Sequence, residues 1–93
     1  MVTAIILMNA SRERITAAAQ ELSGIPGISE VFSVSGRYDL VAIARVRDND
    51  ELAELVTGRI ASVEGITGSE TMLAFRAFSK HDLESMFAIG FEG

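Results

Sequence analysis

Apolar positions follow two different periods along the chain. Residues 2–8 are continuously apolar and rich in β-branched side chains, which is typical of a strand in the centre of a sheet. Shorter apolar runs predict further strands over residues 28–34, 40–46 and 71–78. Between these runs, apolar residues recur at helical spacing and predict two helices, with stripes formed by Ile15, Ala18, Ala19 and Leu22, and by Leu52, Leu55, Val56, Ile60 and Val63.

The predicted order is therefore strand, helix, strand, strand, helix, strand. This βαββαβ order predicts an α+β fold, a ferredoxin-like sandwich in which two helices cover one face of an antiparallel sheet. The opposite face of the sheet has no predicted cover, although the mean hydropathy of the chain is +0.30. We therefore expect a homodimer formed through the sheet.

Glycine and acidic residues mark the ends of the helices. Gly24 is expected to end the first helix, and Asp48, Asn49 and Asp50 supply caps for the start of the second. The pattern Gly-Ile-x-Gly occurs at residues 24–27 and 65–68, an offset of 65 − 24 = 41 residues. Because each copy follows a helix and precedes a strand, the pattern indicates a tandem βαβ repeat.

Composition excludes several classes of function. Thirteen acidic and eight basic residues give a net charge of −5, and no two basic residues are adjacent, so we expect no nucleic acid partner. The absence of cysteine excludes disulfides and thiol catalysis. No apolar run approaches the roughly 20 residues of a membrane-spanning helix. We expect a cytoplasmic protein without a membrane partner.

The sequence contains little that is typical of an enzyme. It has no glycine-rich phosphate loop, no metal-ligand spacing and no serine-centred elbow. The acidic residues near Asp48 suit a helix start better than a metal site. We therefore expect no catalytic residue, metal or cofactor. The alternative is a small dimeric α+β-barrel enzyme, such as a cofactorless monooxygenase or isomerase, but the apolar helix stripes leave few polar groups for its cleft.

The main candidate for binding chemistry is the polar segment over residues 35–40. Gly36 permits a sharp reversal between two strands, and Arg37, Tyr38 and Asp39 would be displayed at the tip of the hairpin. A guanidinium, a phenol and a carboxylate together can hold a zwitterion or another polar small molecule. The alternative is an ordinary solvated turn in which Asp39 caps its own backbone.

The segments Ser-Gly-Arg-Tyr-Asp-Leu at 35–40, Val-Ala-Ile-Ala-Arg-Val at 41–46 and Gly-Ile-Thr-Gly-Ser-Glu-Thr at 65–71 resemble one family. Together they are similar to the effector-binding (RAM) domain of Lrp/AsnC transcription regulators, over residues 1–80. The resemblance implies the ferredoxin-like fold, dimers whose sheets face each other, and octamers or larger rings. It also implies amino-acid effectors bound at contacts between dimers.

Carried onto this sequence, the resemblance implies that Gly36, Tyr38 and Asp39 bind the effector. Gly36 would let the backbone approach the ligand and Asp39 would face its ammonium group, while Arg37 would tune specificity. Thr71, at the start of the last predicted strand, is a further ligand-binding candidate. The tail over residues 81–93 is expected to pack on the core or on a neighbouring subunit.

The first strand begins directly after Met1, whereas regulators of this family carry an N-terminal helix-turn-helix domain. The resemblance therefore implies an effector domain that lacks a DNA-binding domain. Its expected function is non-enzymatic sensing of amino acids, which modulates transcription or metabolism through ligand-dependent assembly. It would act alone or with full-length Lrp/AsnC-type regulators.

Overall fold

The computed structural model describes residues 1–78, which form one four-stranded sheet and two helical segments. The strands are β1 (Val2–Ala10), β2 (Ile28–Ser33), β3 (Leu40–Val46) and β4 (Ile66–Leu73). Their order across the sheet is β2-β3-β1-β4, and every neighbouring pair is antiparallel. This arrangement confirms the predicted α+β ferredoxin-like sandwich.

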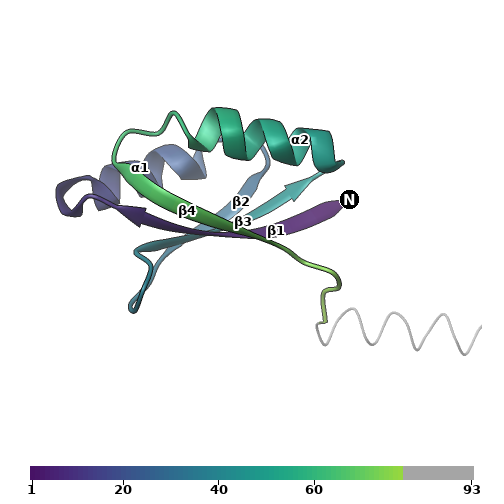
Figure 1. Cartoon of the computed structure of the whole chain (residues 1–93), viewed down its shortest axis with the longest axis horizontal. Helices are drawn as coiled ribbons and strands as arrows, with labels where there is room; N and C mark the ends of the chain where they lie inside the picture. The colour runs from purple at the N-terminus through teal and green to yellow at the C-terminus, as the bar shows by residue number, and fades with distance from the viewer. Residues whose placement is uncertain (79–93) are drawn as a thin grey trace, which may run out of the picture.

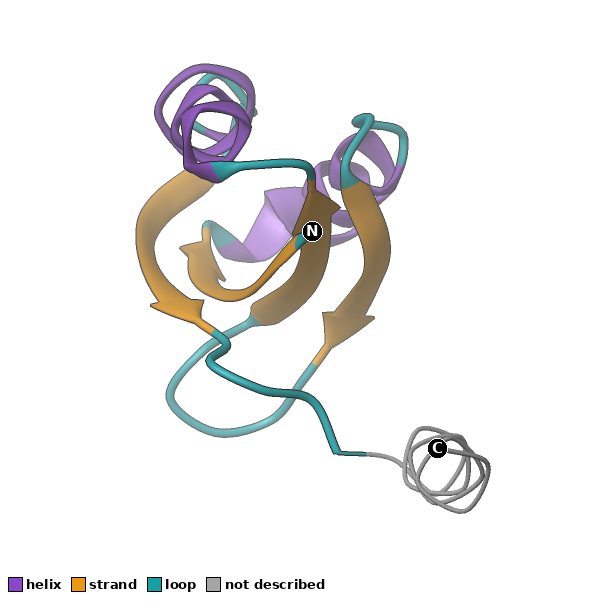
Figure 2. Cartoon of the chain, turned by 90° about the vertical axis from the view of Figure 1, so that its right-hand side faces the viewer, coloured by secondary structure: helices purple, strands orange, loops and turns teal. Residues whose placement is uncertain are grey.

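The two helical segments lie on the same face of the sheet (Figures 1 and 2). They meet the alternate residues of the two central strands, which are buried because successive side chains of a strand point to opposite faces. The buried core lies between these layers and includes Ala4, Ile6 and Met8 of β1, Leu40, Ala42, Ala44 and Val46 of β3, and Ala18, Leu22, Leu55 and Ile60 of the helices.

The first helical segment begins with a short 3-10 turn. A 3-10 turn, η1 (Arg12–Arg14), precedes α1 (Ile15–Ser23), and the Ser11 side chain makes no capping hydrogen bond. Instead, the Ser11 backbone oxygen accepts a bond from the Arg14 N–H at 2.9 Å. At the other end Gly24 is the C-cap, as predicted.

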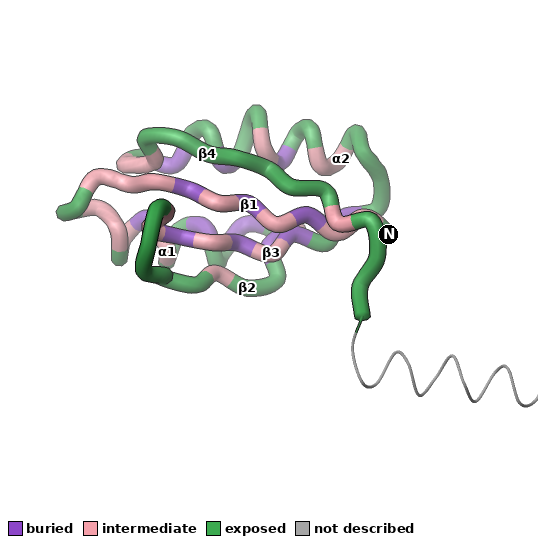
Figure 3. The backbone as a smooth tube through the Cα atoms, turned by 60° about the horizontal axis from the view of Figure 1, so that its bottom comes forward, coloured by how far each residue is buried: buried purple, intermediate pink, exposed green. Residues whose placement is uncertain are grey.

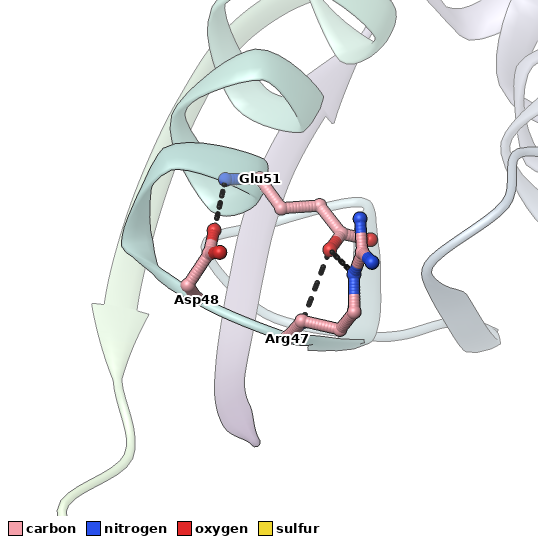
Figure 4. Close-up of polar contacts among 3 residues, drawn as sticks. All are labelled: Arg47, Asp48 and Glu51. Carbon is pink, nitrogen blue, oxygen red and sulfur yellow. Dashed lines mark hydrogen bonds and ion pairs between the residues drawn. The ribbon is translucent and has the colours of Figure 1, made fainter.

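The second helical segment begins at the predicted acidic cap. In α2 (Asn49–Glu54), the Asp48 Oδ1 accepts a hydrogen bond from the Glu51 N–H at 2.8 Å, and the Arg47 Nε lies 3.0 Å from the Glu51 Oε2 (Figure 4). The hydrogen bond from Arg47 lowers the pKa of Glu51. The segment then continues as a π-helical stretch, η2 (Leu55–Ile60). Asp48 therefore caps a helix, as its position indicated.

The internal repeat is present, but its register differs from the predicted one. Gly27 and Gly65 have φ angles of 98° and 100°, and each immediately precedes a strand. The structural offset is therefore 65 − 27 = 38 residues. Matching turn bonds keep the same offset, since Ile25 N–H donates to the Leu22 oxygen and Val63 N–H donates to the Ile60 oxygen. The predicted offset of 41 paired Gly24 with Gly65, but Gly24 has a φ of −88° and Gly65 has a φ of 100°.

The last strand was predicted over residues 71–78 but runs from Ile66 to Leu73. Its first half contains Thr67, Gly68 and Ser69, whose low hydropathy gives no strand signal. The strand lies at the edge of the sheet, where backbone pairing with β1 suffices and polar side chains remain exposed. Beyond Leu73 the chain leaves the sheet. The predicted tail over residues 81–93 lies outside the described residues.

The sheet face opposite the helices carries a continuous apolar patch. The strand register places six apolar side chains on this face, namely Ile5, Leu7, Phe32, Val41, Ile43 and Met72. We call this set the open face. Phe32 and Met72 are 46% and 45% exposed. Figure 3 brings this side forward and shows that the backbone of β1 and β3 alternates between buried and half-buried residues, whereas β4 is exposed.

Candidate functional site

The turn between β2 and β3 has a fixed backbone. The Val34 N–H donates to the Asp39 oxygen at 3.0 Å and closes the reversal. Gly36 adopts a φ of 105°, a conformation that side chains with a Cβ rarely adopt, although a Cβ there would meet no atom within 4 Å. The glycine is therefore required by the backbone angle, and the space around it stays open on the surface.

Asp39 fastens this turn to the end of β1. Its N–H donates to the Met8 oxygen at 2.9 Å, and its Oδ2 accepts a hydrogen bond from the Ala10 N–H at 2.9 Å. The second carboxylate oxygen, Oδ1, makes no hydrogen bond to any residue of 1–78. The carboxylate is therefore held in place through one oxygen, while the other can accept a donor from a ligand.

Tyr38 extends from the turn to the opposite edge of the sheet. Its hydroxyl donates a hydrogen bond to the Glu70 Oε2 of β4 at 2.6 Å. Glu70 pairs with Leu7 and therefore lies on the face opposite the helices. This bond raises the pKa of Tyr38, as do desolvation of the phenol and the charge of Glu70, whereas Arg37 acts in the opposite direction. The turn is thus attached to β1 by Asp39 and to β4 by Tyr38.

Sequence reasoning missed Glu70 as a member of this site. The residue stands next to Thr71 in the segment that carried the family resemblance, but 32 residues separate it from Tyr38. Only the strand order, which places β4 beside β1, brings the two together. Arg37 is exposed and forms no ion pair with the residues that the structure describes.

Thr71 is not close to the turn within one chain. It pairs with Ile6, whose side chain points into the core, so Thr71 lies on the helix-facing side of β4. There it lines an apolar surface hollow of about 360 Å³ together with Leu52, Val56 and Leu73. The turn lies on the other side of the sheet (Figure 1). The structure therefore brings together four of the five predicted residues and separates the fifth.

Other features of residues 1–78 add no second site. No group of three histidine or acidic side chains in that part of the chain could hold a metal ion. No helix in the same range has the length and hydropathy that crossing a membrane requires. Two further hollows, next to Arg59 and next to Glu51, are lined by residues outside the turn.

Comparison with known proteins identifies relatives of this chain. It is 42% identical to TTHA0845 from Thermus thermophilus, whose crystal structure superposes with a TM-score of 0.80 over 86% of this chain and 100% of that one. It is 29% identical to the HTH-type transcriptional regulator FL11 of Pyrococcus furiosus over 75 residues, which are 81% of this chain and 49% of the regulator.

A third relative belongs to a different class of protein. The homocitrate synthase of Sulfurisphaera tokodaii is 34% identical over 61 residues, which are 66% of this chain and 13% of the synthase. The chain thus spans about half of the regulator and a small part of the enzyme. The Lrp/AsnC ligand binding domain family matches residues 3–83, almost the whole sequence. With the fold and the turn described above, this match shows that the chain belongs to the Lrp/AsnC ligand binding domain family.

Proposed function

We propose that this protein senses a small effector, with an amino acid as the ligand, and that it works without catalysis. The observation that supports this proposal most directly is the turn at Gly36, in which one oxygen of Asp39 fixes the backbone and the other is left to accept a ligand. Membership of a ligand-binding family supports the same assignment.

The side chains around the turn match the charges of an amino acid. The Asp39 carboxylate would accept a bond from the ammonium group, and the exposed Arg37 would pair with the ligand carboxylate. The backbone at Gly36 lets the ligand approach closely, because no Cβ stands in the way. Tyr38 would form one wall of the site, and its bond to Glu70 holds the ring in place.

Assembly is the second part of the proposal. The apolar open face would be covered by the same face of a second copy, which gives a homodimer. Dimers would associate further into rings, where Thr71 and its hollow on one protomer would meet the turn of another. A full-length Lrp/AsnC-type regulator could enter the same assembly because it carries the same domain.

Regulation would follow from linkage between binding and assembly. A ligand that contacts two protomers binds the assembled state more tightly than the separated one, and it shifts the equilibrium by that difference in affinity. We therefore expect the fraction of rings to rise with effector concentration.

The first test is a thermal-shift screen of the purified protein against the twenty amino acids. A ligand that binds only the folded state at about 100 times its Kd stabilises it by about 2.7 kcal/mol. For the amino acid that raises the Tm, Asp39→Asn should weaken binding at least tenfold in calorimetry. This variant keeps an oxygen that can accept the bond from Ala10 N–H but removes the charge that faces the ammonium group.

The matched control is Asp50→Asn, which makes the same change in charge at an exposed position on α2. It should bind like the wild type. If no amino acid raises the Tm, amino-acid sensing is contradicted. If one does but Asp39→Asn binds it normally, the ligand binds elsewhere and the turn is not the site.

A further inference from the structure

We propose that residues 74–78 form an arm that packs Phe75 and Phe78 against the open face of a second copy of this chain. This inference rests on the dimer in the proposed function and adds to it a segment that the sheet-to-sheet contact alone does not include. The arm exists because β4 ends at Leu73. A strand that continued to residue 78 would have placed both phenylalanines within the sheet.

The arm leaves the sheet on the side of the open face. The last backbone contact of this edge is the hydrogen bond from Ala74 N–H to the Thr3 oxygen at 2.9 Å. Beyond it the chain turns away from the helices, in both Figure 1 and Figure 2. The turn that carries Tyr38 projects to the same side from the other end of β1. The open face therefore lies between the turn and the arm.

The aromatic residues of the arm contact little of their own chain. Phe75 is 99% exposed and Phe78 is 72% exposed, whereas the most exposed large apolar residue of the strands, Leu73, reaches 48%. Their own open face stays uncovered, with Phe32 and Met72 almost half exposed. If the arm folded back on its own sheet, its two phenylalanines would bury Phe32 and Met72 and would themselves be buried. Two exposed aromatic rings beside an exposed apolar face are typical of a contact with another molecule.

The arm adds to the area that two facing sheets can bury. Four strands about 4.8 Å apart and about 23 Å long offer roughly 440 Å² of flat face. A standard stable interface buries about 800 Å² on each partner. Two phenylalanines bury about 150–250 Å² each. The face and the arm together therefore offer an area of the size that a stable dimer buries.

The chemistry of the face favours the same occupant. The six side chains of the open face are aliphatic or aromatic, apart from the sulfur of Met72, and they offer no charge that would select a polar partner. Three charged neighbours lie on the same side of the sheet, namely Glu30, Arg45 and Glu70, which pair with Ile43, Thr3 and Leu7. A second copy supplies the complementary apolar arm and sheet at the same time, because a two-fold contact uses each surface twice.

The first experiment measures dimer dissociation of the full chain by analytical ultracentrifugation. We expect Phe75→Ala with Phe78→Ala to raise the dimer Kd at least tenfold while leaving the circular dichroism spectrum of the protomer unchanged, since both rings are exposed. The control is Leu73→Ala. Leu73 is apolar and about as exposed as Phe32 of the open face, and it lies just before the arm, but its side chain is on the helix side of the sheet. It should leave the dimer Kd within about twofold of the wild type.

A second experiment identifies the chain that the arm contacts. A photo-crosslinking amino acid replaces Phe75 in ¹⁵N-labelled protein, which is mixed with an excess of unlabelled wild type and irradiated. We expect crosslinks between labelled arm peptides and unlabelled peptides that contain Val41 and Ile43. Crosslinks confined to labelled peptides would place the contact within one chain and would overturn the proposal, even if the double variant had weakened the dimer.

The outcomes separate this inference from the proposed function. A wild-type chain that is monomeric at all concentrations would contradict both the dimer and the arm. A stable dimer that the double variant leaves unchanged, with no crosslink between chains, would overturn the arm alone and leave the sheet-to-sheet dimer standing.

Discussion

At the scale of single residues, the turn is held by two side chains with separate tasks. Asp39 joins it to β1 through the Ala10 N–H, and Tyr38 joins it to β4 through Glu70. Because these bonds use only one oxygen of Asp39, the turn is fixed while a charged acceptor stays available. A site that is shaped before the ligand arrives loses less conformational freedom on binding.

The bond between Tyr38 and Glu70 can be tested by ultraviolet titration, because this chain has one tyrosine and no tryptophan. The bond raises the pKa of Tyr38, so the phenol should ionise at a higher pH than in the unfolded chain. Glu70→Gln should lower the midpoint toward the unfolded value. Equal midpoints in the two proteins would show that the bond does not form in solution.

The raised pKa of Tyr38 also predicts how the stability of the fold depends on pH. The folded pKa of Tyr38 lies above the unfolded one, so the stabilising contribution is fully present below the unfolded pKa of tyrosine. It is lost as the pH rises through the folded pKa. Loss of the phenol proton in alkaline solution therefore removes the bond, which holds the turn in the neutral range.

At the scale of elements, the two helix-to-strand connections use one backbone arrangement. Gly27 and Gly65 both adopt positive φ directly before a strand, and the turn before each is closed by the same hydrogen bond. The second connection is more crowded, because a Cβ at Gly65 would lie 2.5 Å from the Arg14 Cβ. Position 65 therefore requires glycine for two reasons, the positive φ and the close packing against η1.

Gly65→Ala should therefore destabilise the fold by about 1–3 kcal/mol from the backbone angle, and further because of the contact with Arg14. Urea denaturation measures the change in the free energy of unfolding. Gly68→Ala is the matched control, since a Cβ there meets no atom within 4 Å. A loss of stability that is no larger for Gly65→Ala than for this control would contradict the requirement for glycine at position 65.

At the scale of the whole molecule, the sheet has one face covered by helices and one apolar face that the described chain leaves open. The covered face supplies the core of the protomer, and the open face supplies the proposed contact between protomers. Because the turn projects on the open side, assembly through this face would bring other chains close to the candidate site.

Ile43→Glu should separate the proposed dimer, because it places a charge in the middle of the open face, where a partner would bury it. Sedimentation velocity should show a protomer, and circular dichroism should show that it keeps its helical and sheet content. Thr16→Glu adds the same charge at an exposed position of α1 and should leave the assembly intact. A dimer that survives Ile43→Glu would place the contact on another surface.

The amino-acid sequence was enough to predict the order of the elements, the buried face of each helix and the cap at Asp48. These features depend on neighbours within a few residues, so periodicity and capping chemistry reveal them. It also located the turn at Gly36, because glycine between two apolar runs is a local signal. The predicted limits of β4 were wrong because the prediction relied on local hydropathy. A polar edge strand is stabilised by hydrogen bonds to the backbone of β1, which local hydropathy does not reveal.

The contacts between residues far apart in the sequence became known only from the fold. The pairing of β4 with β1 brings Glu70 to Tyr38, places Thr71 on the far side of the sheet from the turn and leaves Phe75 and Phe78 outside the sheet. The contacts of the turn depend on strand order and register across separations of 29 and 32 residues. Local patterns do not specify that register, because a shift of one residue would turn every side chain of β4 to the opposite face without changing its sequence.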